Sequence, residues 1–452
     1  MNAIDSARDG RGSSGGYYRW IICLLLFFAT TINYVDRSVL SVLEPELKKI
    51  IHWTPAQFGY VNAAFTLAYA IGFLFAGWMM DRIGVRWGYA ISLVLWSLAA
   101  ASHCFASTIW GFAIARFALG LGESGNFPAA IKTVAEWFPR KERAFATGLF
   151  NSGSNIGAII APLIVPAILV WKGWSASFIA TGLIGIVWVF FWLPLYRPPR
   201  QHPRLSPQEL AYIESDPADP PQRVPWAKLL PFRQTWAFAA GKFLTDSVWW
   251  FYVFWLGKFM NEQFKVDIKG IGPPMITVFL LADVGSIAGG WLSSRLLAGG
   301  WSANAARKTV MLICAVCVVP VAMAPLVKNP WTAVLLIGLA SAAHQGFSAN
   351  LFTFTSDMFP RHAVGSVVGI GGFAGAMGGF FTQMLAGNVM KLSDDLFGAK
   401  SAATQIGAEV VEKHSGGSYI AVFALAAVSY LLALFIIHML VPRLEPVQLS
   451  EK

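Results

Sequence analysis

Long apolar runs recur throughout this chain and leave few folds open to it. Twelve runs of about 18 or more residues can be counted along the 452-residue sequence. A helix of that length satisfies its own backbone hydrogen bonds while crossing roughly 30 Å of hydrocarbon, so each run predicts a transmembrane helix. The composition, 56% hydrophobic and only 13% charged, lies outside that of soluble domains. We therefore expect an all-α, multi-pass membrane protein with twelve transmembrane helices.

A proline-rich stretch divides the twelve runs into two sets of six. Nine prolines in residues 197–232 exclude a membrane helix there and predict a linker. Within it, Ser206 followed by Pro207 and Glu209 predicts the start of a short surface helix. The expected parts are a disordered cytoplasmic N-terminus 1–19, a six-helix half 20–196, the linker 197–232, a six-helix half 233–441 and a cytoplasmic tail 442–452. The runs cover about 20–43, 56–80, 86–106, 108–136, 142–170, 174–196, 233–262, 272–297, 306–327, 330–357, 362–391 and 418–441.

Basic residues lie mainly at the ends of these runs. If the N-terminus is inside, the inner loops and tails carry every arginine that lies outside the runs, whereas the outer loops hold only lysines. By the positive-inside rule, both termini are then cytoplasmic. This distribution accounts for the net charge of +10 without a nucleic-acid partner.

The cysteines do not indicate a metal or redox site. Cys23, Cys104, Cys314 and Cys317 all fall within apolar runs, where cysteine acts as a small buried residue. We predict neither a cofactor nor a metal.

A sequence repeat relates the two halves. Residues 136–140, Glu-Trp-Phe-Pro-Arg, recur as 357–361, Asp-Met-Phe-Pro-Arg, 221 positions later, and Gly148 recurs as Gly369 at the same offset. Because six spans return the chain to its starting side, the two halves have the same orientation. Parallel repeats of this kind predict a transporter whose solute site lies between the halves near the membrane midplane.

Two combinations of an acid and an arginine stand inside apolar runs, Asp36 with Arg37 and Arg116 with Glu123. Charges at membrane depth are costly and usually mark a solute or proton path. With a rise of about 1.5 Å per residue, Asp36 and Arg37 lie roughly 25 Å from the inner face, at a height comparable with Arg116. Glu123 lies two helical turns beyond Arg116 on nearly the same face. The two spans are therefore expected to share one cavity.

These charges favour coupled transport. A substrate carboxylate that competes with Asp36 or Glu123 for an arginine would displace the acid, which can then take a proton. Arginine suits this task because its planar fork holds a carboxylate bidentately and never deprotonates. The alternative is that the charges form static ion pairs that fix helix packing.

Other polar and aromatic residues in apolar runs are candidates for binding a hydroxylated solute, because sugars require donors, acceptors and an aromatic platform. They are Tyr34, Tyr69, Asn151, Ser154, Asn155, Trp250, His344, Gln345, Asn350 and Thr353. Residues 77–86 join two spans and predict a conformational clamp, in which glycines let helix ends approach and an acid meets basic residues in one conformation. The clamp residues are Gly77, Asp81, Arg82, Gly84 and Arg86. A merely solvated turn is the alternative.

Five segments together carry a family resemblance: 33–37, 77–86, 116–128, 242–255 and 343–345. With them the chain resembles the anion:cation symporter family of the major facilitator superfamily, and within it the bacterial hexuronate transporters. The resemblance implies proton-driven uptake of organic anions. It also implies that Arg37 holds the substrate carboxylate, that Asp36 and Glu123 are protonatable, and that Arg116 pairs with Glu123. Ser154 and Asn155 stand where the galactonate branch has a glutamine, which disfavours galactonate.

The expected function is proton-coupled import of a hexuronate, such as glucuronate or galacturonate, across a bacterial inner membrane by alternating access. The expected partners are membrane lipid, protons and a small carboxylate substrate, and the chain is expected to be a monomer. Another carboxylate, such as an aldarate, an aldonate or an aromatic acid, is the first alternative. An organophosphate exchanger fits less well, because the seventh span offers only Lys242. An intramembrane enzyme lacks a Ser/His/Asp order or an HExxH motif to support it, and a sensor lacks a sizeable soluble output domain. We therefore expect a transporter and not an enzyme.

Overall fold

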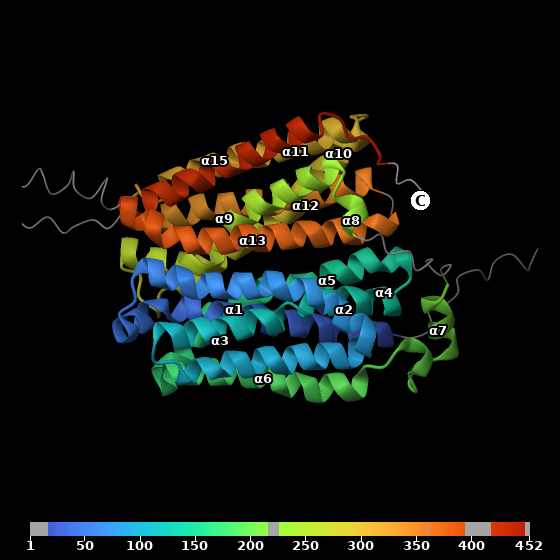
Figure 1. Cartoon of the computed structure of the whole chain (residues 1–452), viewed down its shortest axis with the longest axis horizontal. Coiled ribbons are helices and arrows are strands. Elements are labelled where there is room, and N and C mark those ends of the chain that lie inside the picture. Colours follow the sequence, from blue (N-terminus) through green and yellow to red (C-terminus); the bar gives the residue numbers. More distant parts are fainter. Residues whose placement is uncertain (1–16, 216–225, 360, 394–416, 448–452) are drawn as a thin grey trace, which may run out of the picture.

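A computed structural model shows an all-helical protein built from two bundles of long helices lying side by side (Figure 1). It describes residues 17–215, 226–359, 361–393 and 417–447. The predicted N-terminal segment 1–19 and the tail 442–452 thus lie partly outside the described residues. Both ends of the described chain lie at one end of the bundles, called here the near end, and the opposite end is called the far end.

The first bundle contains six helices and is called the N half. Its helices are α1 (Tyr18–Ile51), α2 (Pro55–Ser102), α3 (Ile109–Glu123), α4 (Asn126–Trp137), α5 (Arg140–Lys172) and α6 (Trp174–Leu195). The helix α2 contains two of the predicted spans. Gly84 separates them, because its backbone angles, φ 79° and ψ 156°, are not helical. Glycine adopts a positive φ at little cost, so the chain can change direction between the two spans.

The second bundle, the C half, repeats this arrangement. Its helices are α9 (Arg233–Phe264), α10 (Gly272–Ala298), α11 (Ala303–Val318), α12 (Pro330–Met358), α13 (Arg361–Ser393) and α15 (Gly417–Leu440). The repeated motif has the same structural role in both halves. It ends α4 at Trp137 and α12 at Met358, and the next helices begin at Arg140 and Arg361.

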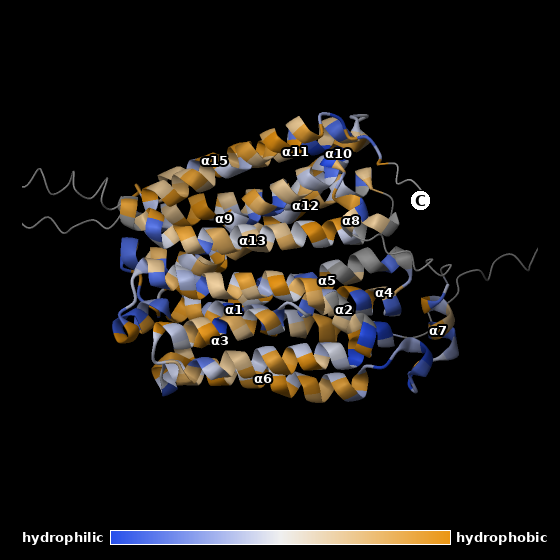
Figure 2. Cartoon of the chain, in the orientation of Figure 1, coloured by the Kyte–Doolittle hydropathy of each residue, from blue (hydrophilic) through white to orange (hydrophobic). Residues whose placement is uncertain are grey.

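Ten described helical segments are long and apolar enough to cross a membrane. The other two predicted spans differ for physical reasons. The span at 108–136 is broken into α3 and α4 around Gly125, so neither piece reaches spanning length. The span at 233–262 lies in α9, which carries Lys242, Asp246, Lys258 and Glu262. Apolar side chains dominate the middle of the helices and polar ones gather at both ends (Figure 2), as expected of a multi-pass membrane protein.

Among the described residues, the most extensive contacts between the halves are those of α1 with α9, α2 with α13, and α5 with α10. Two glycines at the far end permit the closest approach. A Cβ on Gly59 of α2 would lie 2.3 Å from the Gln383 carbonyl oxygen, and one on Gly387 of α13 would lie 2.3 Å from Ala56 Cα. Since backbone lies against backbone here, the halves are packed tightly at the far end.

The linker is attached to the N half at the near end. The predicted short helix is present as α7 (Pro207–Ile213), with Ser206 Oγ accepting from the Glu209 amide at 3.1 Å. The Glu209 carboxylate turns to α1, where it accepts from the Arg19 amide at 3.1 Å and pairs with the Arg19 guanidinium at 3.2 Å. His202 packs on the Tyr18 ring, and burial lowers the pKa of its imidazole.

The predicted clamp lies around the interruption of α2 at the near end. Arg86 donates to the Leu193 carbonyl of α6 at 2.7 Å, and Trp192 Nε1 donates to the Arg86 carbonyl at 2.9 Å. Arg82 is exposed. Gly77 and the Asp81 side chain lie outside the described part of the structure, so the clamp stays a prediction.

Candidate substrate site

A buried ion pair joins two helices of the N half at the centre of the molecule. Arg37 of α1 donates to one carboxylate oxygen of Glu123 on α3, with Nη2 at 2.8 Å and Nε at 3.0 Å from Oε2. Both side chains are almost fully buried, at 3% and 0% exposure. Arg37 Nη2 also donates to Asn33 Oδ1 at 3.3 Å. The guanidinium is therefore held by a carboxylate from a second helix and by an amide from its own.

The second oxygen of this carboxylate is free of protein partners. Glu123 Oε1 is buried and has no hydrogen-bond partner among the described residues. A carboxylate oxygen in that state has a vacant position for a proton, which would convert it into a donor. The pair thus contains a fixed cation and a carboxylate with one oxygen that accepts no hydrogen bond from the described residues.

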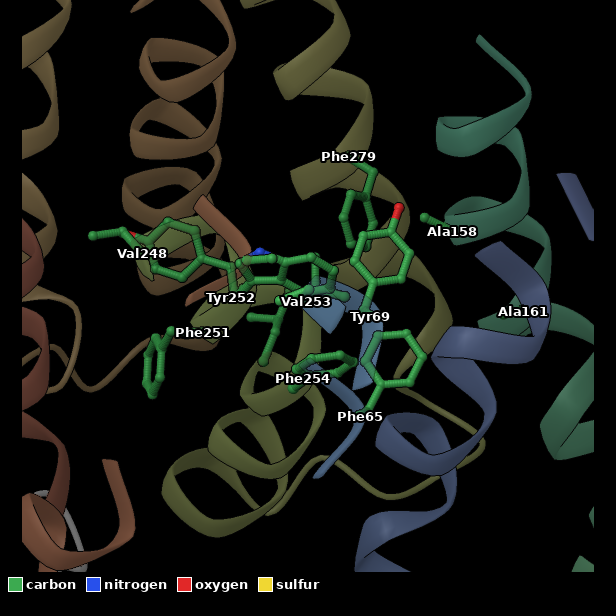
Figure 3. Packing of buried hydrophobic residues seen from close by; sticks show 14 of the residues in the cluster. Phe65, Tyr69, Ala158, Ala161, Val248, Phe251, Tyr252, Val253, Phe254 and Phe279 are labelled. Atoms are coloured by element: carbon green, nitrogen blue, oxygen red, sulfur yellow. The ribbon is translucent and has the colours of Figure 1, made fainter. Parts of the chain in front are cut away.

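Four aromatic rings enclose the Arg37 guanidinium. The ring centroids of Tyr34, Tyr69, Trp250 and Phe65 lie 4.5, 4.9, 5.1 and 5.3 Å from its Cζ atom. Trp250 comes from α9, so the C half completes an enclosure that the N half begins. Figure 3 shows Phe65 and Tyr69 beside Phe254 and other aromatic side chains of α9. The ion pair therefore lies at the boundary between the halves, and rings of this kind attract cations and stack on sugars.

Arg116 has a different place from the one expected. Its guanidinium donates to the Arg37 carbonyl at 3.2 and 3.3 Å and to Asn62 Oδ1 at 3.2 Å. Glu123 is taken by Arg37, so the expected Arg116–Glu123 hydrogen-bonded pair is not formed. Arg116 is fully buried and also lies over Phe65. It supports the backbone that carries Arg37 and makes no direct contact with the carboxylate of the pair.

Asp36 is separated from its neighbour Arg37. Both of its carboxylate oxygens are buried without a hydrogen-bond partner among the described residues, and the side chains that interact with it most closely include Thr181 and Trp96. Successive residues on a helix point about 100° apart, so Asp36 and Arg37 cannot face the same space. Asp36 and Arg37 therefore form no ion pair with each other, and Asp36 points into the N half.

The predicted residues of α5 make two kinds of contact, one within the helix and one with the C half. Asn151 is exposed, and Ser154 Oγ donates to its carbonyl at 2.7 Å, which is a bond within the helix. Asn155 Nδ2 donates to the Asp283 carboxylate on α10 of the other half. Asn155 therefore belongs to the interface between the halves.

The predicted residues of α12 mostly pack inside the C half. The His344 ring stacks on Trp249 at 4.9 Å, and its Nδ1 lies 2.7 Å from the Tyr430 hydroxyl. Asn350 donates to two backbone carbonyls at 2.9 and 3.2 Å, and Thr353 donates to one within its own helix at 2.8 Å. Gln345 is half-buried. Interhelical bonding of this kind is the common role of polar residues in membrane helices.

Lys242 and Asp246 form an ion pair on α9. Lys242 Nζ lies 2.8 Å from Asp246 Oδ1 and 2.7 Å from Oδ2, so it contacts both oxygens. The two side chains are 9% and 15% exposed. The C half therefore contributes a charged pair of its own, one helical turn from Trp250.

A second set of buried charges lies at the far end and joins the halves. Lys258 of α9 pairs with Glu44 of α1 at 2.8 Å and with Glu262 at 2.7 Å. Glu262 also accepts from Lys48 at 2.5 Å and from the Tyr419 hydroxyl at 2.6 Å. Lys258 and Glu44 are buried, at 0% and 1% exposure. These residues, Glu44, Lys48, Lys258, Glu262 and Tyr419, are called the far-end charge cluster below.

Sequence analysis missed this cluster and part of the central enclosure. Asn62, Phe65 and Tyr69 follow one another at intervals of three and four residues, a spacing that places them on one face of α2. This spacing could have identified Asn62 and Phe65, which were not predicted, from Tyr69, which was. The far-end partners lie 214 positions apart, and no local pattern relates them.

Two repeated six-helix halves that enclose a buried ion pair define a membrane transporter with its candidate site between the halves. The family model described as Major Facilitator Superfamily matches residues 26–383. The chain belongs to this superfamily. It is thus a transporter, which excludes the intramembrane enzyme considered above.

Named relatives are found among sugar-acid transporters. The chain is similar to the hexuronate transporter of Escherichia coli strain K12, with 33% identity over 79% of this chain and 84% of the relative. The galacturonate transporter of Dickeya chrysanthemi is 33% identical over 61% of this chain and 81% of the relative. The D-galactonate transporter of Escherichia coli O6:H1 is 30% identical over 85% and 90%.

Solved structures share the fold. A bacterial homolog of the human lysosomal transporter Spinster, in an inward-facing and occupied conformation, has a TM-score of 0.72 at 19% identity and covers 95% of this chain and 97% of that one. A D-xylose–proton symporter has a TM-score of 0.70 at 15% identity, with coverages of 93% and 97%. These identities are low, so the likeness concerns the fold alone.

Proposed function

We propose that this protein imports a hexuronate, such as glucuronate or galacturonate, together with a proton. The observation that carries the proposal is the buried Arg37–Glu123 pair inside an aromatic enclosure completed by Trp250 from the other half. The names of the relatives support a sugar acid as the substrate class. Among these names, a galactonate or an aldarate is the second candidate.

The coupling arises from competition for Arg37. The substrate carboxylate takes the place of the Glu123 carboxylate on the guanidinium fork, where it gains two charge-assisted hydrogen bonds. Glu123 then loses its counter-ion in a dry environment, which favours the protonated form. Its vacant Oε1 receives the proton. Substrate and proton therefore occupy the site together and leave it together.

Alternating access supplies the two entrances. At the far end, the far-end charge cluster and the Gly59 and Gly387 contacts hold the halves together. With the near end facing the cytoplasm, as the arginine distribution predicts, this arrangement corresponds to a protein closed to the outside. Opening the far end requires those contacts to separate.

Counterflow and gradient-driven uptake in proteoliposomes test this proposal. Labelled glucuronate and galacturonate should exchange with internal substrate without a gradient, and an inward proton gradient should drive their accumulation. An organic phosphate and a neutral hexose serve as comparison solutes. Exchange of the phosphate ester but of no sugar acid, or accumulation that ignores the proton gradient while a sodium gradient drives it, would contradict the proposal.

A further inference from the structure

The Lys242–Asp246 pair borders the same region between the halves as the Arg37–Glu123 pair. Trp250, one turn further along α9, lies over the Arg37 guanidinium at 5.1 Å. Asp246 lies four residues before Trp250, so the two side chains lie on the same face of α9. Asp246 therefore faces the N half, close to the Trp250 ring that covers the Arg37 guanidinium.

Asp246 and Trp250 lie one helical turn apart along α9. The rise of about 1.5 Å per residue places Asp246 roughly 6 Å along the helix from Trp250, a distance comparable with the length of one sugar ring. A solute whose carboxylate is held at Arg37 can thus present its opposite end to the Lys242–Asp246 pair. The pair is accessible to it, because its side chains are 9% and 15% exposed.

We propose that the Lys242–Asp246 pair binds the hydroxyl groups at the end of the sugar acid opposite its carboxylate, and that it excludes solutes with a second carboxylate there. This inference rests on the proposed function, because it assumes that a sugar acid is held at Arg37. It assigns the substrate class as sugar acids with one carboxylate, and it disfavours aldarates.

The charge balance of the pair is the physical reason. Lys242 donates and Asp246 accepts, so together they match the donor and acceptor capacity of neighbouring hydroxyl groups. Their charges cancel, which leaves no net cation for a second carboxylate. A dianion placed there would face Asp246, and like charges repel strongly in a water-poor site.

Displacement of Asp246 by a second carboxylate is also hindered. Glu123 meets Arg37 through one oxygen and comes from a different helix, so it can move away. Asp246 contacts Lys242 Nζ through both of its carboxylate oxygens, and the two residues are one turn apart on the same helix. It also lies against α13, where a Cβ on Gly375 would be 2.2 Å from Asp246 Oδ2. Asp246 therefore remains beside Lys242.

Competition binding on the purified full-length protein tests the inference. Unlabelled glucarate and glucuronate compete with labelled glucuronate for wild-type protein and for D246N. In the wild type, glucarate should compete at least about tenfold less well than glucuronate. In D246N, Lys242 is freed, and the ratio should shift towards glucarate by about tenfold or more. The matched control is D357N, which removes an acid that pairs with Arg307 at 3.2 Å far from the site, and its ratio should equal that of the wild type.

Two further variants keep the test decisive. D246S replaces D246N if the asparagine variant is not monodisperse, because a small side chain fits against Gly375. The double variant K242Q/D246N keeps the position neutral, so it should weaken glucuronate binding without a shift towards glucarate. An unchanged ratio in the single variants, or an equal shift in the double variant, overturns the inference. Absence of any sugar-acid binding by the wild type instead overturns the proposed function.

Discussion

The central Arg37–Glu123 pair and the Lys258–Glu44 pair of the far-end charge cluster are both buried, yet they connect different parts of the molecule. Arg37 and Glu123 both belong to the N half. The pair of Lys258 and Glu44 connects the C half with the N half. A bond inside one half can persist when the halves move as bodies, whereas a bond between halves must break whenever they separate.

The comparison separates recognition from gating. Inside one half, exchange of a carboxylate partner changes charge without moving helices, which suits solute and proton binding. Between the halves, the same kind of ion pair stabilises one conformation and is lost in the other. The following predictions test whether the two sets of charges have these separate roles.

The largest effect is expected from Arg37→Lys. Lysine keeps the charge but loses the fork that binds a carboxylate through two nitrogens, so substrate affinity should fall by about 3 kcal/mol, or more than about a hundredfold. Substrate-induced thermal stabilisation of the purified protein measures this loss. Arg307→Lys, in an ion pair at the near end, is the matched control. Near-normal affinity in Arg37→Lys would remove Arg37 from the substrate site.

Lys258→Met should act on conformation. It leaves Glu44 buried without its cation, and breaking a buried pair costs about 3–5 kcal/mol. The far-end-closed state should lose population, so spin labels at positions 50 and 269 in a cysteine-free background should show longer distances. The control is Lys49→Gln, which removes a lysine that is 71% exposed and pairs within its own helix. Unchanged distances in Lys258→Met would show that the cluster does not hold the far end closed.

Glu123→Gln should separate exchange from accumulation. Glutamine cannot take up the proton, but Arg37 is still available to the substrate carboxylate, so counterflow should stay within about threefold of the wild type. With one proton per anion, wild-type accumulation should rise about tenfold for each unit of pH gradient, and Glu123→Gln should lose this dependence. Glu46→Gln at the exposed far end is the control. Proton-driven accumulation that survives in Glu123→Gln would place the proton site elsewhere.

Gly387→Ala should give the smallest effect and isolates packing from charge. The added Cβ would meet backbone atoms of Ala56 at 2.3 and 2.4 Å, so α2 and α13 must move apart at the far end. Overpacking of this kind costs about 1–3 kcal/mol. The same spin labels should report a partial opening. Gly372→Ala on the same helix has open space around its Cβ and serves as the control. Equal label distances in the two variants would show that glycine packing does not hold the far end closed.

The sequence predicted the fold well because hydropathy and repeats are local signals. The end of α12 at Met358 and the start of α13 at Arg361 were predictable from the copy of the motif in the N half, where α4 ends at Trp137 and α5 begins at Arg140. The helical rise per residue also placed Arg37 and Glu123 at depths where both can reach one cavity. It could not show whether Asp36 or Glu123 is the partner of Arg37, because that depends on the rotation of α1 about its axis. The pairing of Glu44 with Lys258 depends on how the two halves dock, for which the chain carries no local signal.

Proton uptake on substrate binding tests the central claim most directly, namely that Arg37 exchanges the Glu123 carboxylate for that of the substrate. Purified protein in a weakly buffered solution, mixed with glucuronate at neutral pH, should take up about one proton for each molecule bound. Glu123→Gln should bind glucuronate with no proton uptake. Binding without proton uptake by the wild type, or undiminished uptake by Glu123→Gln, would contradict the account.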